Sequence, residues 1–172
     1  TSEFGNVYIL PEGGTNDLAV KGCEEILDSH TDSFDFICCA VGTSGTISGI
    51  IRSSKNHQKV LGFPALKDSG FLKNEINRFT NRSNWELITE YHFGGYGKTC
   101  EELINFTNSF KKDFEIPLDP VYTAKMMYGI AELMKDGYFP EGSKVLAIHT
   151  GGLQGIEGMN EKLKQENKTI LK

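Results

Sequence analysis

The chain has 172 residues and a mass of 19.1 kDa, a length that predicts one domain with a sizeable core. Its net charge of −5 argues against a nucleic-acid partner, because such a protein is expected to carry a basic face. No apolar run approaches the ~20 residues of a membrane-spanning helix, so no membrane partner is expected. The four cysteines lack zinc-ligand spacing, which predicts no metal site. Buried thiols indicate a reducing compartment, with the cytoplasm as the default localisation.

Strand and helix patterns alternate along the chain. A short apolar strand is expected at 7–10, followed by a helix capped by Asn16 or Asp17. Next come a continuous apolar strand at 34–41, a helix through 47–51, a strand at 59–63, a helix at 71–79 and a strand at 85–89. A glycine-rich loop at 91–97 leads to helices at 100–114 and 121–135, a strand at 144–148 and a helix from about 154. The polar residues 161–172 are expected to form a fraying, solvated helix end.

Strands that are continuous apolar runs and alternate with helices indicate a parallel sheet covered on both faces. We therefore predict a single α/β domain over residues 1–172, with a doubly wound, mostly parallel sheet and helices on both faces. Cys38 and Cys39 are adjacent in one strand and should point to opposite faces. Ligands of such sheets bind outside the carboxyl ends of the strands. Four candidate loops are rich in Gly, Thr, Ser or Tyr, namely 11–16, 42–46, 91–97 and 149–152.

The loop Gly42-Thr43-Ser44-Gly45-Thr46 joins a predicted buried strand to a helix. Its small residues allow backbone N–H groups to converge, and the helix N-terminus adds about half a positive charge. This combination predicts a phosphate cradle, although the Walker lysine and the GxGxxG spacing are both missing. A tight turn without a ligand is an equally good interpretation of this segment alone.

The other loops carry weaker signals when each is taken alone. The hydroxyl in His149-Thr150-Gly151-Gly152 could bond a heteroaromatic nitrogen without placing a charge beside it, but a helix cap after a glycine turn is the simpler interpretation. Tyr96 and Tyr122 are flanked by glycine or proline, a setting more typical of packing residues.

Five short motifs occur in the order Pro-Glu-Gly-Gly, Gly-Thr-Ser-Gly-Thr, Gly-Tyr-Gly, Asp-Pro-Val-Tyr-Thr-Ala-Lys and His-Thr-Gly-Gly. In this order they resemble the pyridoxal-phosphate enzymes that include 1-aminocyclopropane-1-carboxylate deaminase and D-cysteine desulfhydrase, which have the tryptophan-synthase-β-like fold (fold type II). The resemblance covers nearly the whole chain. It implies pyridoxal 5'-phosphate as cofactor, a small amino acid as substrate, a role in amino acid metabolism and a homodimer for the complete enzyme.

The resemblance also implies a role for particular residues. Thr43, Ser44, Gly45 and Thr46 would hold the cofactor phosphate. Thr123 and Thr150 would lie near the pyridine nitrogen, and Gly13 would approach the substrate through its backbone. Tyr96 and Tyr122 would face the substrate side of the cofactor as the catalytic residues, with Tyr122 assisting proton transfer or contacting the leaving sulfur.

Two threonines favour one branch of this family. Deaminases that open the cyclopropane ring typically have Glu and Leu where this chain has Thr123 and Thr150. A Glu keeps the pyridine nitrogen protonated and gives a strong electron sink, whereas a hydroxyl supports a weaker one. We therefore expect α,β-elimination from D-cysteine to pyruvate, ammonia and sulfide. The alternatives are the cyclopropane-carboxylate deaminase, a non-catalytic phosphate-binding α/β module and a purely structural fragment.

One departure from the family is large. The family's Schiff-base lysine and small domain lie in an N-terminal segment, and no lysine of this chain occupies a matching motif. The chain therefore resembles the C-terminal half of a two-domain enzyme, comprising part of its large domain. We expect these 172 residues alone to be inactive, because the covalent tether of the cofactor would be missing.

Overall fold

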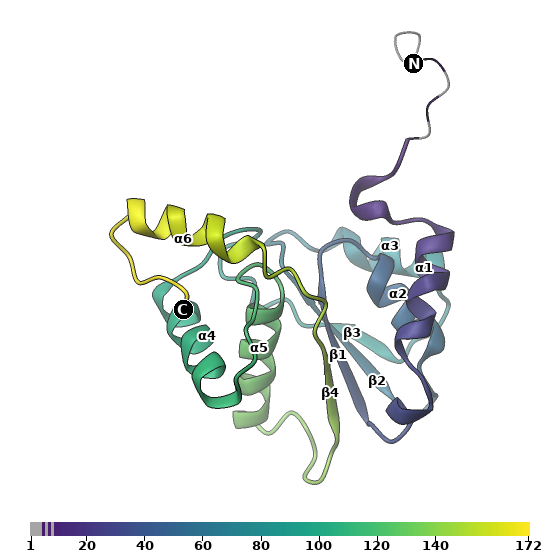
Figure 1. The fold of residues 1–172 in the computed structure, drawn as a ribbon. Coiled ribbons are helices and arrows are strands. Elements are labelled where there is room, and N and C mark those ends of the chain that lie inside the picture. Colours follow the sequence, from purple (N-terminus) through teal and green to yellow (C-terminus); the bar gives the residue numbers. More distant parts are fainter. Residues whose placement is uncertain (1–4, 6, 8) are drawn as a thin grey trace.

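The fold, a computed structural model that describes residues 5, 7 and 9–172, is built on one four-stranded parallel sheet (Figure 1). Its strands are β1 (Phe36–Val41), β2 (Lys59–Pro64), β3 (Trp85–Leu87) and β4 (Val145–Ile148), in the spatial order β3-β2-β1-β4. Phe36 at the start of β1 lies opposite Lys59 on one side and Val145 on the other. Because all strands run in the same direction, their carboxyl ends meet at one edge.

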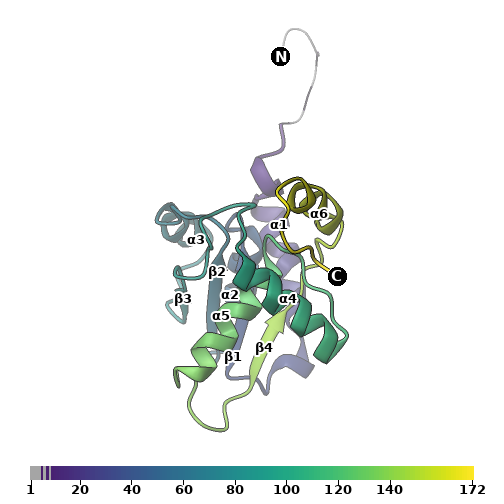
Figure 2. The ribbon, with the colours of Figure 1, turned by 90° about the vertical axis from the view of Figure 1, so that its left-hand side faces the viewer.

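Six α-helices surround the sheet in the described part of the chain. They are α1 (Asp17–Cys23), α2 (Gly45–Ser53), α3 (Phe71–Phe79), α4 (Glu101–Phe114), α5 (Thr123–Lys135) and α6 (Gly155–Gln165). The quarter-turn view of Figure 2 places α4 and α5 in front of the sheet and α1 and α2 behind it. Over the residues described, no helix combines the length and the apolar character needed to cross a bilayer.

Each face of the sheet carries its own apolar core. On one face Cys39 packs with Ile47 and Ile50 of α2, and on the other Cys38 packs with Met126 of α5. Successive side chains of β1 therefore pack into opposite cores, as predicted for the two adjacent cysteines. Helices on both faces confirm the predicted α/β fold with a doubly wound parallel sheet.

The strand predicted at 7–10 is wrong. Val7, Ile9 and Leu10 lie outside any strand, with Ile9 76% exposed, and Tyr8 lies outside the described residues. The described residues of this segment have exposed side chains and belong to no strand of the sheet. An apolar run forms a strand only where a sheet edge accepts its backbone hydrogen bonds.

The end of the chain is more ordered than the sequence predicted. Helix α6 ends at Gln165, and the last residues then return to α4. Asn108 bonds the Ile170 carbonyl and the Lys172 N–H, and Asn160 bonds both backbone groups of Leu171. The Leu171 side chain is only 4% exposed and packs with Ile104 and other apolar side chains. The segment 161–172 is mostly exposed, as expected, but the expectation that its end frays is wrong, because the last residues are hydrogen-bonded and Leu171 is buried.

Candidate functional site

The four candidate loops meet at the carboxyl edge of the sheet through a chain of contacts. Thr15 of the first loop donates a hydrogen bond to Thr43 of the second at 2.8 Å. Tyr122, just before α5, contacts Gly42 and stacks edge-on against Tyr96 of the third loop. The fourth loop follows β4, and its Gly152 packs on Asp119.

The N-terminus of α2 is open to an anion. The adjacent helix α1 is capped by Asn16, whose side chain accepts the Ala19 N–H at 2.9 Å. At the start of α2 the buried Ser44 occupies the cap position, but its side chain makes no capping bond to the described residues. The first N–H groups of a helix have no partner within the helix, so those at Gly45 and Thr46 remain available to a ligand. This geometry fits the predicted phosphate cradle.

Two glycines allow the neighbouring loops to approach the cradle closely. Gly13 has φ +65°, and a Cβ there would lie 2.6 Å from the Thr43 hydroxyl oxygen. At Gly42, a Cβ would lie 3.0 Å from Cε1 and 3.1 Å from the hydroxyl oxygen of Tyr122. Side chains at either position would displace a predicted site residue, so both glycines keep the site compact.

Tyr122 is a protonated phenol at neutral pH. Burial raises its pKa to about 12, assisted by the hydroxyl of Tyr96 and by the negative charges of Asp119 and Glu12. The Tyr96 and Tyr122 rings have centroids 5.9 Å apart and an interplanar angle of 68°. Tyr96 itself is 60% exposed. The pair therefore places a neutral phenol next to Gly42, at the start of the predicted cradle.

Asp119, which the sequence interpretation missed as a site residue, organises the start of α5. Its buried carboxylate accepts N–H bonds from Val121, Tyr122 and Thr123 at 2.7–2.9 Å. The Thr123 hydroxyl donates to the same carboxylate at 2.8 Å and accepts the Asp119 N–H. The signal was an Asp preceding a helix, a residue type favoured at helix starts. The Asp119 carboxylate thus holds the backbone of Tyr122, and it already accepts the hydrogen bond that the hydroxyl of the fully buried Thr123 can donate.

Thr150 lies in the loop after β4 and is exposed. Its neighbour His149 has a structural role, since Nδ1 accepts the Gly151 N–H and Nε2 then donates to the Pro117 carbonyl at 2.9 Å. In the same loop, a Cβ added at Gly152 would lie 3.2 Å from the carboxyl carbon of Asp119. The loop after β4 thus approaches Asp119 at Gly152, two residues beyond the exposed Thr150.

Lys125 is a second residue that the sequence interpretation did not single out. Its Nζ donates to the carbonyls of His92 and Gly95, at 2.9 and 2.7 Å, in the glycine-rich loop. Burial lowers the pKa of this amine to about 8, although the Asp119 carboxylate opposes the shift. It ends the motif Asp-Pro-Val-Tyr-Thr-Ala-Lys, but its burial and its contact with the loop were not predicted, because lysine is usually an exposed residue.

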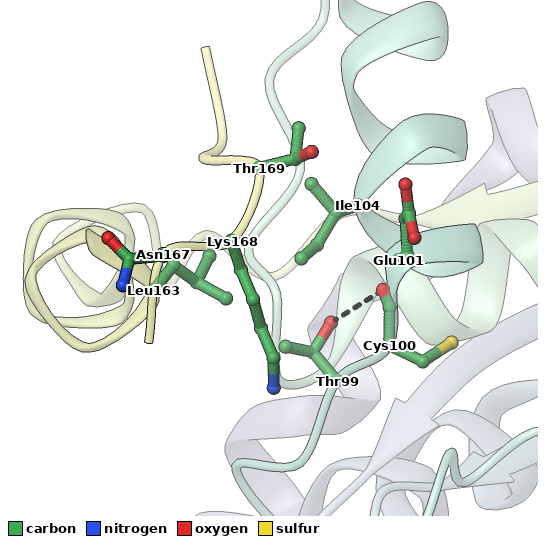
Figure 3. A pocket seen from close by; sticks show the side chains of 8 residues that line it. All are labelled: Thr99, Cys100, Glu101, Ile104, Leu163, Asn167, Lys168 and Thr169. Carbon is green, nitrogen blue, oxygen red and sulfur yellow. Dashed lines mark hydrogen bonds between the residues drawn. The ribbon is translucent and has the colours of Figure 1, made fainter. Parts of the chain in front are cut away.

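A cavity of about 210 Å³ lies between the start of α4 and the end of α6 (Figure 3). Cys100 and Thr99 line one side, and Lys168 and Thr169 line the other. None of the predicted site residues lines this cavity. It is therefore separate from the cradle and its tyrosines.

The chain is similar to known proteins over most of its length. The chain is 34% identical over 169 residues to a bifunctional D-cysteine desulfhydrase/1-aminocyclopropane-1-carboxylate deaminase, mitochondrial, of Arabidopsis thaliana, a match that covers 87% of the chain and 42% of the relative. It is 30% identical over 178 residues to a 1-aminocyclopropane-1-carboxylate deaminase of Bradyrhizobium sp. (strain ORS 278), covering 90% of the chain and 52% of the relative. The chain thus spans about half the length of the curated relatives it matches. No protein-family model matches it.

Solved structures show the same fold. The crystal structure of an ACC deaminase homologue superposes with a TM-score of 0.78 at 26% identity, covering 92% of this chain and 53% of that one. The processed form of threonine deaminase isoform 2 from Solanum lycopersicum superposes with a TM-score of 0.54 at 14% identity, covering 85% of this chain and 47% of that one. The second likeness concerns the fold alone.

Proposed function

Because this chain belongs, as a C-terminal portion, to the family of 1-aminocyclopropane-1-carboxylate deaminases and D-cysteine desulfhydrases, we propose that its full-length protein is a pyridoxal-phosphate-dependent lyase of a small amino acid. That family uses pyridoxal phosphate. The observation that supports the proposal is the close approach of Tyr122 to Gly42, because Gly42 begins the predicted phosphate cradle and Tyr122 is a neutral phenol.

The residues of the cradle fit the cofactor. The N–H groups of Gly45 and Thr46 and the hydroxyls of Thr43 and Ser44 would hold the phosphate, at the positive end of α2. When bound, the cofactor supplies the electron sink for bond cleavage next to the amino group. The Gly13 backbone lies against Thr43 and would bind the substrate carboxylate or amine.

Thr123 and Thr150 would have different roles near the pyridine nitrogen. Thr123 is committed to Asp119 through both a donated and an accepted hydrogen bond. Thr150 is exposed in the loop after β4 and would make the direct contact to the nitrogen. A hydroxyl does not force protonation of the ring as a carboxylate would, and this favours elimination of a good leaving group such as a thiolate.

The electrostatics of Tyr122 favour a neutral phenol over a tyrosinate. With a pKa raised to about 12, the phenol keeps its proton throughout the physiological range. Tyr122, with Tyr96 beside it, would donate a hydrogen bond to the leaving sulfur. The reaction proposed is therefore α,β-elimination from D-cysteine, which yields pyruvate, ammonia and sulfide.

The second candidate is deamination of 1-aminocyclopropane-1-carboxylate, favoured by the name of the Bradyrhizobium relative. The two reactions are separated by giving each substrate to the full-length protein loaded with pyridoxal phosphate. Equal amounts of sulfide and pyruvate from D-cysteine would support elimination, whereas 2-oxobutyrate from the cyclopropane substrate would support the second candidate. Cofactor binding with neither product would reject both.

Two further parts of the proposal concern the complete protein. The 172 residues would be one half of a two-domain enzyme and inactive alone, since the resemblance places the cofactor-binding lysine in the other half. The full-length enzyme would be a homodimer.

A further inference from the structure

The glycine-rich loop that carries Tyr96 has little structure of its own. Phe93, Gly94, Gly95 and Gly97 all have positive φ angles, between 52° and 111°. Within the loop the backbone bonds are the Gly95 N–H to the His92 carbonyl and the Lys98 N–H to the Gly95 carbonyl. Glycine-rich segments lose much conformational entropy on ordering, so the position of this loop depends on contacts from outside it.

Lys125 supplies such a contact from α5. Its ammonium bonds the carbonyls of His92 and Gly95 and so bridges the two ends of one turn of the loop. The side chain is only 1% exposed, and its two partners in the loop are neutral carbonyls. Burying an ammonium is costly unless it is hydrogen-bonded, and an apolar residue of similar length would fill the same space without that cost. The hydrogen bonds to the loop are therefore the distinctive contribution of a lysine here.

The bridged turn leads directly to Tyr96. This residue follows Gly95, whose carbonyl is the closer of the two Lys125 partners at 2.7 Å. Because the Tyr96 ring is 60% exposed, packing alone holds it weakly. Its partner Tyr122 lies three residues before Lys125, at the start of the same helix. One helix end thus holds both the loop backbone and the ring that Tyr96 contacts.

We propose that Lys125 is a positioning residue, which holds the loop 91–97 through two carbonyls so that Tyr96 meets Tyr122. Its effect on turnover rests on the proposed function, whereas its effect on the loop does not. In this role the lysine acts through Tyr96.

The test uses the full-length protein and Lys125→Met, with Lys135→Met as the matched control at the exposed end of α5. Hydrogen exchange of the amides in 91–99 should become about tenfold faster in Lys125→Met, with α5 and β1 unchanged and no effect of Lys135→Met. Unchanged exchange in 91–99, or a rise of the same size across α5 and β1, would overturn the proposal. If Lys125→Met does not fold, Lys125→Leu, which also lacks hydrogen-bond donors, is measured against the same two criteria.

Turnover provides a second readout through Tyr96. We expect Lys125→Met to lower kcat about tenfold, but less than about twofold further when Tyr96→Phe is already present. Equal losses in both backgrounds would contradict a role through Tyr96. If the wild-type protein turns over neither D-cysteine nor the cyclopropane substrate, the proposed function fails, and hydrogen exchange still decides the role of Lys125.

Discussion

Gly42 leaves just enough room for the Tyr122 ring, so a single methyl group should disturb the site. A Cβ at this position would lie 3.0 Å from the ring, closer than ordinary van der Waals contact. We expect Gly42→Ala in the full-length enzyme to lower kcat about tenfold by moving the phenol. Gly22→Ala is the control, since its Cβ would meet no atom within 4 Å. A wild-type kcat for Gly42→Ala would show that the contact is unimportant.

The buried amine of Lys125 should make the stability of the protein depend on pH. Its pKa is about 8 in the folded protein against 10.5 for the free group. Between these values the unfolded chain binds more protons at this site, so the contribution to the free energy of unfolding rises with pH. The measurement is urea unfolding of the wild type and Lys125→Met from pH 7 to pH 10.5. The wild-type free energy should rise relative to the variant above pH 8, and a constant difference would contradict the assignment.

At the scale of elements, the tail after α6 is held by α4. Leu171 is buried against Ile104, and its backbone is bonded on both sides by Asn160. We expect Leu171→Ala to reduce the free energy of unfolding by about 2 kcal/mol or more, the usual loss for a buried leucine. Leu153→Ala, at a position 37% exposed, should change it by less than about 1 kcal/mol. Equal effects in urea denaturation would show that the tail is not docked in solution.

The elements that the sequence predicted well are those fixed by local pattern. The helix 71–79 was predicted with its observed bounds, because its apolar residues recur with helical spacing. The predictions of a strand at 7–10 and of a fraying chain end failed for one shared reason. A strand requires a neighbouring edge and a buried Leu171 requires α4, and both depend on segments distant in the sequence.

The site divides in the same way. The topology alone predicted that the loops carrying Thr43 and Tyr96 would lie at one edge, since parallel strands end together, whereas a place for Tyr122 at the site followed only from the resemblance. The roles of Asp119 and Lys125 were missed. The Lys125 partners lie 30 and 33 residues away, and no periodic pattern carries that information. The commitment of the Thr123 hydroxyl to Asp119 likewise appears only in the folded structure.

At the scale of the whole molecule, the chain holds one side of the proposed active site. It spans about half of its curated relatives, and the resemblance places the cofactor-binding lysine in the other half. The isolated 172 residues should therefore release no sulfide from D-cysteine, even with added pyridoxal phosphate. Sulfide release at the rate of the full-length protein would show that the other half is not needed for the reaction.

We propose that Tyr122, which lies against the predicted phosphate cradle, is a catalytic residue of the full-length enzyme. The most direct measurement is the kcat for D-cysteine of the pyridoxal-phosphate-loaded Tyr122→Phe variant. Tyr138→Phe is the control, since that hydroxyl bonds Lys59 and Glu86 away from the cradle. We predict a loss of about 100-fold or more for Tyr122→Phe with cofactor binding retained, and near wild-type turnover for Tyr138→Phe. Wild-type turnover by Tyr122→Phe would show that the Tyr122 hydroxyl has no catalytic role.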